Sequence, residues 1–220
     1  MFFQAYTLMP MSTPALPRGR HAAPRQVVWE SQRGRMLAAM AEAVGEKGYG
    51  AVAVADVIAR AGVSRRTFYE QFGNKEECFL AAYDAGVDAM LAAIDDAIAD
   101  AAGSGPLAVA RAGTARYLAT LAANPAFART FLIEVLAAGP RALERRSAVH
   151  ARFAEQLAAM HRAARTSRGS APPAHVFRAC VGAIHELVTD HVLLGGAESL
   201  PELLEPLVAI EAALLLAAPR

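Results

Sequence analysis

Residues 56–77 read DVIARAGVSRRTFYEQFGNKEE, and this stretch decides the fold. It begins inside a short helix, which Gly62 ends because glycine adopts positive φ without a steric penalty. Ser64 is a good N-cap for a second helix, since its hydroxyl can accept from a free backbone N–H. Phe68 and Phe72, four residues apart, give the second helix a buried face. The stretch therefore predicts two short helices joined by a tight turn, which is the outline of a helix-turn-helix.

The other face of the second helix is basic and polar. Its side chains are those of Arg65, Arg66, Tyr69 and Gln71. In a helix-turn-helix, the second helix fits into a major groove of DNA. The charge distribution agrees, because residues 1–75 hold ten Lys/Arg and five Asp/Glu, whereas residues 76–220 hold twelve and sixteen. This division favours a small N-terminal domain that meets phosphate.

The same stretch resembles the DNA-binding signature of TetR-type transcriptional regulators. The shared features are the Ala-Gly-Val-Ser turn at 61–64, the Thr-Phe-Tyr triplet at 67–69, and Phe72 followed by Asn-Lys-Glu-Glu at 74–77. The resemblance covers roughly residues 33–83. It implies an all-α protein, in which an N-terminal three-helix helix-turn-helix DNA-binding domain precedes a larger helical ligand-binding and dimerisation domain.

The resemblance also implies roles for single residues. The positions that match the family's DNA contacts are Ser64, Arg65, Arg66, Thr67, Tyr69, Gln71 and Lys75. Arg65, Arg66 and Thr67 match positions that reach base edges, and an arginine can bond guanine O6 and N7 together. The last three match positions that touch phosphate oxygens. The alternative for the two arginines is an ordinary solvated helix face.

Two positions depart from the family's pattern. Val52-Ala53-Val54 stand where the family commonly has threonines that cap the helix and touch phosphate. A lost N-cap costs about 1 kcal/mol of helix stability unless another group substitutes. Gln71 stands where histidine or tyrosine is usual, and its amide keeps a hydrogen-bond donor. We therefore expect either a weakened helix start near Val54 or a substitute cap.

Composition divides the chain into three predicted parts. Residues 1–28 form a flexible basic arm, 29–75 the helix-turn-helix DNA-binding domain, and 76–220 the ligand-sensing and dimerisation domain. The arm is rich in proline and arginine and buries too little surface to order itself. It is either an arm that enters a minor groove or a solvated tail.

Apolar periodicity and helix breakers predict about nine helices. They are expected near residues 29–47, 54–61, 64–72, 75–103, 106–123, 126–137, 140–167, 174–194 and 199–217. Leucines and other apolar residues surround nearly the whole final helix, so one face packs internally and another needs a partner surface. The resemblance implies that the last two helices pair with their mates in a homodimer.

Large side chains on the apolar faces of the later helices are candidates for a ligand pocket. These candidates are Phe79, Tyr83, Tyr117, Phe127, Phe131, Phe153, Met160, Phe177 and Cys180. Polar groups on the same apolar helices are candidates to orient a ligand. They are Glu134, His161, His185 and Glu186. The alternative for both groups is ordinary core packing or a buried hydrogen bond.

The predicted function is a ligand-responsive transcriptional regulator. It would bind a palindromic double-stranded DNA operator as a homodimer and be released by a small, largely apolar effector, which makes it a repressor. The alternative is a dimeric DNA-binding protein without a ligand response. A ligand that rotates each arm would prevent simultaneous docking at two half-sites about 34–36 Å apart.

Several other classes are disfavoured. The two cysteines are far apart and outside any CxxC spacing, so neither a disulfide framework nor a zinc site is expected, and no cofactor is indicated. An enzymatic bundle metal site would use Glu-x-x-His pairs, and no glutamate here has a histidine three residues on. The apolar segment 200–218 is interrupted by prolines and glutamates, which argues against a membrane span. We expect a cytoplasmic protein that is not an enzyme.

Overall fold

The computed structural model describes residues 25–164 and 171–216, and all regular structure in these ranges is helical. The first helix, α1 (Arg25–Lys47), begins before the predicted residue 29. Residues 25–28, which were expected to belong to the flexible arm, therefore form the first turn of α1. A hydrogen bond of 2.9 Å from Gln26 Nε2 to Glu30 Oε1, one turn apart, supports this turn. The rest of the predicted arm, residues 1–24, lies outside the described residues.

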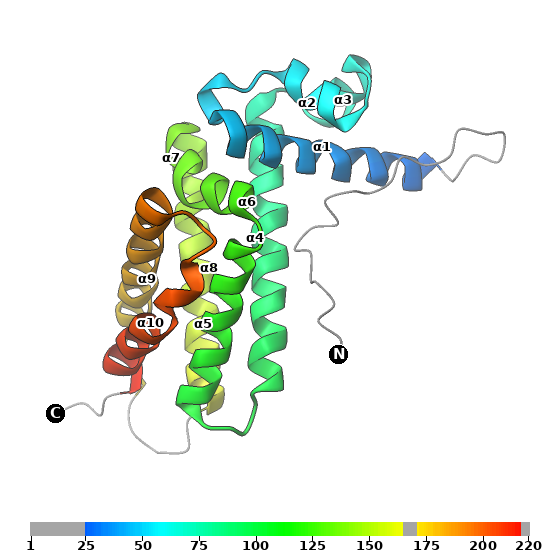
Figure 1. Cartoon of the computed structure of the whole chain (residues 1–220). Coiled ribbons are helices and arrows are strands. Elements are labelled where there is room, and N and C mark those ends of the chain that lie inside the picture. The colour runs from blue at the N-terminus through cyan, green and yellow to red at the C-terminus, as the bar shows by residue number, and fades with distance from the viewer. Residues whose placement is uncertain (1–24, 165–170, 217–220) are drawn as a thin grey trace, which may run out of the picture.

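The predicted helix-turn-helix is present at one end of the molecule (Figure 1). After α1 come the short 3₁₀ turn η1 (Tyr49–Ala51), α2 (Val54–Ala61) and α3 (Arg65–Gln71). Gly62 has a φ of 62° and ends α2 in the left-handed conformation, as the sequence predicted. Ser64 Oγ accepts from the Thr67 N–H at 3.0 Å, which confirms Ser64 as the N-cap of α3.

The remaining helices form a bundle below the helix-turn-helix (Figure 1). They are α4 (Lys75–Asp100), α5 (Pro106–Ala122), α6 (Pro125–Arg129), the π-helical turn η2 (Thr130–Glu134), α7 (Val135–Ala137), α8 (Pro140–Ala164), α9 (Ala174–Gly195), the 3₁₀ turn η3 (Leu200–Leu203), α10 (Leu204–Glu211) and the π-helical turn η4 (Ala212–Leu216). The segments from α6 to α7 and from η3 to η4 are each continuous in sequence. Apart from the single turn η1, the described part of the chain thus contains nine helical segments, which agrees with the predicted number.

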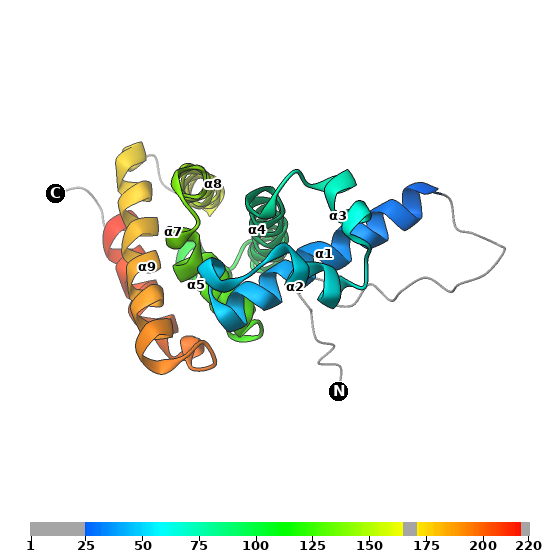
Figure 2. The same ribbon diagram turned by 90° about the horizontal axis from the view of Figure 1, so that it is seen from above.

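The view from above shows α4 and α8 almost end-on, with α1 crossing α4 and α9 on the outer side of the bundle (Figure 2). One hydrophobic core runs through both predicted domains. Met36, Met40 and Val44 of α1 are completely buried in the same cluster as Phe79 of α4 and Phe131 of η2. None of the described helices is long and apolar enough to cross a membrane.

Helix α6 lies very close to both α1 and α4. A Cβ atom built on Gly45 of α1 would lie 2.6 Å from the Cα of Ala126, and one built on Gly86 of α4 would lie 2.1 Å from Cε2 of Phe127. Both positions therefore have room for glycine alone. The hydroxyl of Thr130 adds a contact with α1, donating to the carbonyl of Ala41 at 3.3 Å as well as to Ala126 at 2.8 Å.

Candidate nucleic-acid interface and internal cavity

Helix α3 presents a basic, solvent-facing surface. Arg65, Arg66 and Tyr69 are all exposed, and the side chain of Arg66 is 88% accessible. The Arg66 guanidinium forms an ion pair of 2.8 Å with Glu70 one turn later, and the Arg65 guanidinium lies 5.6 Å from the centre of the Tyr69 ring. Two of the three residues predicted to reach base edges, Arg65 and Arg66, thus share an open surface with Tyr69, a predicted phosphate contact, while the third, Thr67, is half-buried.

The opposite face of α3 is anchored in the core. Phe68 is completely buried and Phe72 nearly so, and their ring centroids lie 5.7 Å apart. At the start of the helix, the hydroxyls of Ser64 and Thr67 lie 2.9 Å from each other. The Ser64 hydroxyl also caps the helix, so its first role is to fix the start of α3.

An acid in the first turn of α2 stabilises the start of this helix. Asp56 Oδ2 accepts from the Ala53 N–H at 2.8 Å, and Asp56 Oδ1 accepts from Lys47 Nζ at 2.7 Å. The Lys47 ammonium and, after it, the Ala53 N–H lower the pKa of Asp56. A carboxylate in the first turn is also favoured by the helix dipole. Asp56 therefore supplies the acid's half of a capping box, and the N-cap residue Ala53 has no side-chain oxygen to supply the other half.

Two of the residues expected to touch phosphate are held by the protein itself. Lys75 Nζ donates to the carbonyls of Tyr49 at 2.9 Å and Val52 at 3.0 Å, and lies 4.2 Å from the centre of the Tyr49 ring. Gln71 Nε2 donates to the Trp29 carbonyl at 3.3 Å. Both side chains connect helices within the DNA-binding unit, and phosphate contact by either remains a prediction.

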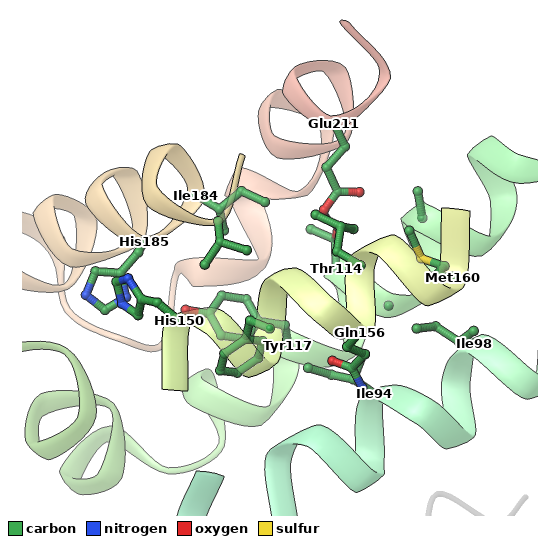
Figure 3. A pocket seen from close by; sticks show the side chains of 15 residues that line it. Ile94, Ile98, Thr114, Tyr117, His150, Gln156, Met160, Ile184, His185 and Glu211 are labelled. Atoms are coloured by element: carbon green, nitrogen blue, oxygen red, sulfur yellow. Dashed lines mark hydrogen bonds between the residues drawn. The ribbon is translucent and has the colours of Figure 1, made fainter. Parts of the chain in front are cut away.

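A cavity lies among α4, α5, α8, α9 and α10 (Figure 3). It has about 650 Å³ of space free of protein atoms, its opening to solvent included. Its lining residues are Ile94, Ile98, Ala110, Gly113, Thr114, Tyr117, His150, Phe153, Gln156, Leu157, Met160, Val181, Ile184, His185 and Glu211. A mainly apolar lining with a few polar groups is typical of small-molecule sites.

The structure places three of the nine predicted pocket residues in this lining, namely Tyr117, Phe153 and Met160. The other six are not among the lining residues. Those six are Phe79, Tyr83, Phe127, Phe131, Phe177 and Cys180. The first four stack in a row between α4 and the α6–η2 segment, with ring centroids 5.6–6.5 Å apart. The last two belong to a separate small cluster with Ala154 and Leu215. All six pack within hydrophobic clusters of the protein.

Of the four predicted polar groups, only His185 lines the cavity. Glu186 is exposed, and the ring of His161 packs edge-on against Phe177. Glu134 instead joins the bundle to the DNA-binding unit. Its Oε2 accepts from the Tyr49 N–H at 2.8 Å, and its Oε1 forms an ion pair with Arg129 at 3.0 Å. The carboxylate therefore connects separate parts of the chain and does not line the cavity.

Apart from His185, the polar groups that face the cavity were not predicted from the sequence, above all Glu211. This side chain is only 5% exposed, and its Oε1 accepts from Thr114 Oγ1 at 2.8 Å. Its Oε2 has no hydrogen-bond partner. Burial raises the pKa of Glu211 to about 7, although the Thr114 hydroxyl acts in the opposite direction. The sequence does contain one sign of this site, because Glu211 is a single acid within the apolar run Val208–Leu216.

Two histidines form another part of the wall. The rings of His150 and His185 have centroids 4.5 Å apart, and Figure 3 shows them beside Tyr117. Burial, followed by nearby positive charge from Arg146, lowers the pKa of His150 to about 4. Burial, followed by His150 and Arg146, lowers the pKa of His185 to about 3. Both imidazoles are therefore neutral at pH 7.

The raised pKa of Glu211 predicts a specific pH dependence of stability. In the unfolded chain this carboxyl ionises near its ordinary pKa of 4.5, whereas the folded protein keeps the proton up to about 7. The folded state therefore loses stability as the pH rises between these values. Glutamine does not titrate, so the variant Glu211→Gln does not lose this stability. We therefore expect the free energy of unfolding of Glu211→Gln, relative to that of wild type, to rise by about 2–3 kcal/mol from pH 5 to pH 8.

Urea unfolding at both pH values measures this difference. The two histidines titrate in both proteins, so their effect cancels in the comparison. Glu205→Gln, on the same helix but exposed and paired with Arg111, is the matched control. A difference between Glu211→Gln and wild type that stays constant from pH 5 to pH 8 would show that Glu211 ionises normally.

Comparison with known proteins identifies the N-terminal unit. Residues 36–82 match the family model described as "Bacterial regulatory proteins, tetR family". The chain carries a TetR-family DNA-binding domain. This match confirms the resemblance to TetR-type regulators, and the matched residues run from α1 through the helix-turn-helix into α4. The HTH-type transcriptional activator FasR of Mycolicibacterium smegmatis is 29% identical over 82 residues, which make up 37% of this chain and 37% of that protein.

Solved structures resemble the chain over most of its length. FadR from Bacillus halodurans has a TM-score of 0.69 at 17% identity, covering 81% of this chain and 93% of that one. FadR from Bacillus subtilis in complex with stearoyl-CoA has the same score and identity, covering 80% and 95%. A TetR family regulator from Marinobacter aquaeolei scores 0.65 at 19% identity, covering 90% and 100%. These likenesses confirm that the helices behind the TetR-family domain complete a TetR-like fold.

Proposed function

We propose that the chain is a ligand-responsive transcriptional regulator that binds a palindromic DNA operator as a homodimer. Helix α4 is the observation that carries this proposal. It starts at Lys75, beside the helix-turn-helix, and its Ile94 and Ile98 line the cavity. With 26 residues, it spans about 39 Å. A molecule in the cavity therefore touches the same rigid element that supports the DNA-binding helices.

The exposed side of α3 supports sequence-specific binding. The guanidinium group of an arginine can donate two hydrogen bonds at once, to O6 and N7 of a guanine. The side chains of Arg65 and Arg66 are both exposed, so both are free to do so. The ion pair of Arg66 with Glu70 is exposed, so exchanging it for a base contact costs little.

Exposed leucines support dimerisation through the last two helices. Leu187, Leu193 and Leu194 of α9 and Leu214 of η4 are each at least 40% exposed, and Leu194 is 90% exposed. Apolar side chains gathered on the last helices favour a partner surface. An isologous pairing of this face would set two α3 helices against successive major grooves of one duplex.

The effector is proposed to be small and largely apolar, and to release the protein from its operator, so that the protein acts as a repressor. A ligand alters DNA affinity only if it binds the free and DNA-bound conformations with different affinity. A cavity bordered by α4 satisfies the geometric requirement for such a difference. The stearoyl-CoA complex of Bacillus subtilis FadR supports an effector with a large apolar part.

Selection of DNA by the purified protein from a random duplex pool tests the proposal. We expect enrichment of a palindrome whose half-sites lie about one helical turn apart. Retention of all sequences alike, with strong salt dependence, would contradict sequence-specific regulation. If a palindrome is enriched but no cavity ligand changes its affinity, the second candidate holds, namely a dimeric DNA-binding protein without a ligand response.

The selected operator then serves to test Arg66. We expect Arg66→Ala to weaken operator binding by about 1–3 kcal/mol and to relax the preference at one base pair, because a bidentate guanine contact is lost. Fluorescence anisotropy with the operator and its single-base variants measures both effects. Arg152→Ala is the control, since Arg152 is an exposed arginine of α8 that pairs with Asp88. Equal loss on all sequences would assign Arg66 to phosphate.

A further inference from the structure

The cavity contains a buried carboxyl oxygen without a partner. Oε2 of Glu211 has no hydrogen bond, although the whole side chain is 95% buried. Figure 3 shows the carboxyl group directed from α10 toward Thr114 across the cavity wall. A buried carboxylate is costly unless it is hydrogen-bonded or paired with a cation. The site therefore lacks a donor that a bound molecule can supply.

The rest of the lining offers no permanent positive charge. Among the described residues that line the cavity, none is lysine or arginine, and His150 and His185 are neutral at pH 7. The side-chain amide of Gln156 is already used, since its Nε2 donates to Leu91 O at 3.1 Å and Asp95 Oδ1 at 2.6 Å. The Thr114 hydroxyl donates to the other oxygen of Glu211. Nε2 of His150 and Nε2 of His185 are also buried without a hydrogen-bond partner, and the remaining surface is mainly aliphatic and aromatic.

We propose that this cavity binds an apolar molecule that carries a protonated amine, and that the ammonium group donates to Glu211 Oε2. The inference rests on the proposed effector cavity and names the chemical class that it selects. The apolar part of the ligand lies against Ile94, Ile98 and Met160, which face the same space in Figure 3. The ammonium supplies both the missing donor and the opposite charge.

Charge distinguishes an amine from other apolar ligands at this site. A hydrogen bond between an ammonium and a carboxylate is roughly twice as strong as one between neutral groups. A carboxylate ligand would instead meet the negative charge of Glu211 in a poorly solvated space, where like charges repel strongly. An alcohol makes the hydrogen bond without the charge. The expected order of affinity is therefore amine, then alcohol, then acid.

A matched series of probes tests this order. Phenylbutylamine, phenylbutanol and phenylbutyrate share one apolar skeleton and differ in the terminal group. Their binding to the full-length wild-type chain is measured by titration calorimetry at pH 8, above the pKa of about 7 of Glu211, so that the carboxyl is ionised. We expect the amine to bind at least about tenfold more tightly than the alcohol, and the acid to bind most weakly.

Glu211→Gln tests whether this carboxyl causes the preference. We expect the amine to lose its advantage over the alcohol, while the affinity for the alcohol stays within about threefold of wild type. Glu205→Gln removes the same charge from the surface of α10 and is expected to keep the preference. The wild-type series alone decides the order of affinity, so the test does not depend on the folding of a variant.

The outcomes separate this inference from the proposed function. Binding of the alcohol or the acid as tightly as the amine would overturn the amine specificity and leave an effector cavity in place. An amine preference that survives Glu211→Gln would also overturn the assignment. If none of the three probes binds the wild-type chain, both the amine specificity and the proposed effector cavity are contradicted.

Discussion

Replacing Gly86 with alanine is expected to lower the free energy of unfolding by about 3 kcal/mol. In an open helix, this change is normally stabilising, because alanine has the higher helix propensity. Here the new Cβ would lie 2.1 Å from Cε2 of Phe127, in the contact between α4 and α6. Either the ring or the backbone must move, and close-packed interiors resist both. Urea unfolding followed by circular dichroism at a fixed protein concentration measures the loss.

Gly182→Ala is the matched control for this experiment. Gly182 lies within α9, and a Cβ at this position would have no heavy atom within 4 Å. We expect Gly182→Ala to be neutral or to stabilise by up to about 1 kcal/mol. Adding Phe127→Leu to Gly86→Ala should restore part of the lost stability, since the clashing ring is removed. A Gly86→Ala protein as stable as wild type would show that α4 and α6 are farther apart than described.

Replacing Leu194 with aspartate is expected to weaken operator binding about 100-fold or more by separating the two subunits. The side chain is 90% exposed in the single chain, so an aspartate there does not disturb the core of the subunit. In the proposed dimer, the same aspartate places a charge in an apolar interface. Each subunit then binds its half-site alone and loses the gain in effective concentration that a dimer has.

Sedimentation velocity and anisotropy titration measure the two parts of this result. Leu107→Asp is the control, because Leu107 is 52% exposed on α5 and lies outside the last two helices. It should leave both the mass of the particle and the operator affinity unchanged. A Leu194→Asp protein that still sediments as a dimer would place the subunit interface elsewhere.

The helix-turn-helix was predictable because local rules determine it. Ser64 as N-cap, Gly62 as the left-handed C-cap residue, and Phe68 four residues before Phe72 each act over one helical turn. The structure confirms all three features. The contact of Asp56 with Ala53, three residues earlier, is equally local, and Asp56 has the position of a capping-box acid.

The cavity was less predictable. Helical periodicity identifies the apolar face of a helix, but it does not say whether that face packs against another helix or lines a cavity. Phe131 and Phe153 show the difference. Both lie on apolar faces and their ring centroids are 6.3 Å apart, yet Phe153 lines the cavity and Phe131 belongs to the aromatic row. Glu211 shows the opposite case, since an acid in an apolar run breaks the expected pattern. Its partner Thr114 is 97 residues away in sequence.

The contacts of Lys75 and Glu134 could not be predicted either, because they also join residues that are far apart in the sequence. Both bond to the backbone of Tyr49, 26 and 85 residues away, and sequence spacing contains no sign of these contacts. A lysine at the start of a DNA-proximal helix resembles a phosphate ligand whether or not its ammonium is engaged. The tertiary structure alone shows that its donors first hold the turn between α1 and α2.

The double attachment of Tyr49 affects how this protein can be recombined with others. Its N–H is bound by Glu134 and its carbonyl by Lys75, so the turn before α2 is assembled from three separate stretches of chain. A chimaera that joins residues 25–75 to a foreign sensing module would leave the Tyr49 N–H without its acceptor. A modular biosensor built from this chain should therefore exchange the α3 residues that are proposed to read the operator and keep the junction whole.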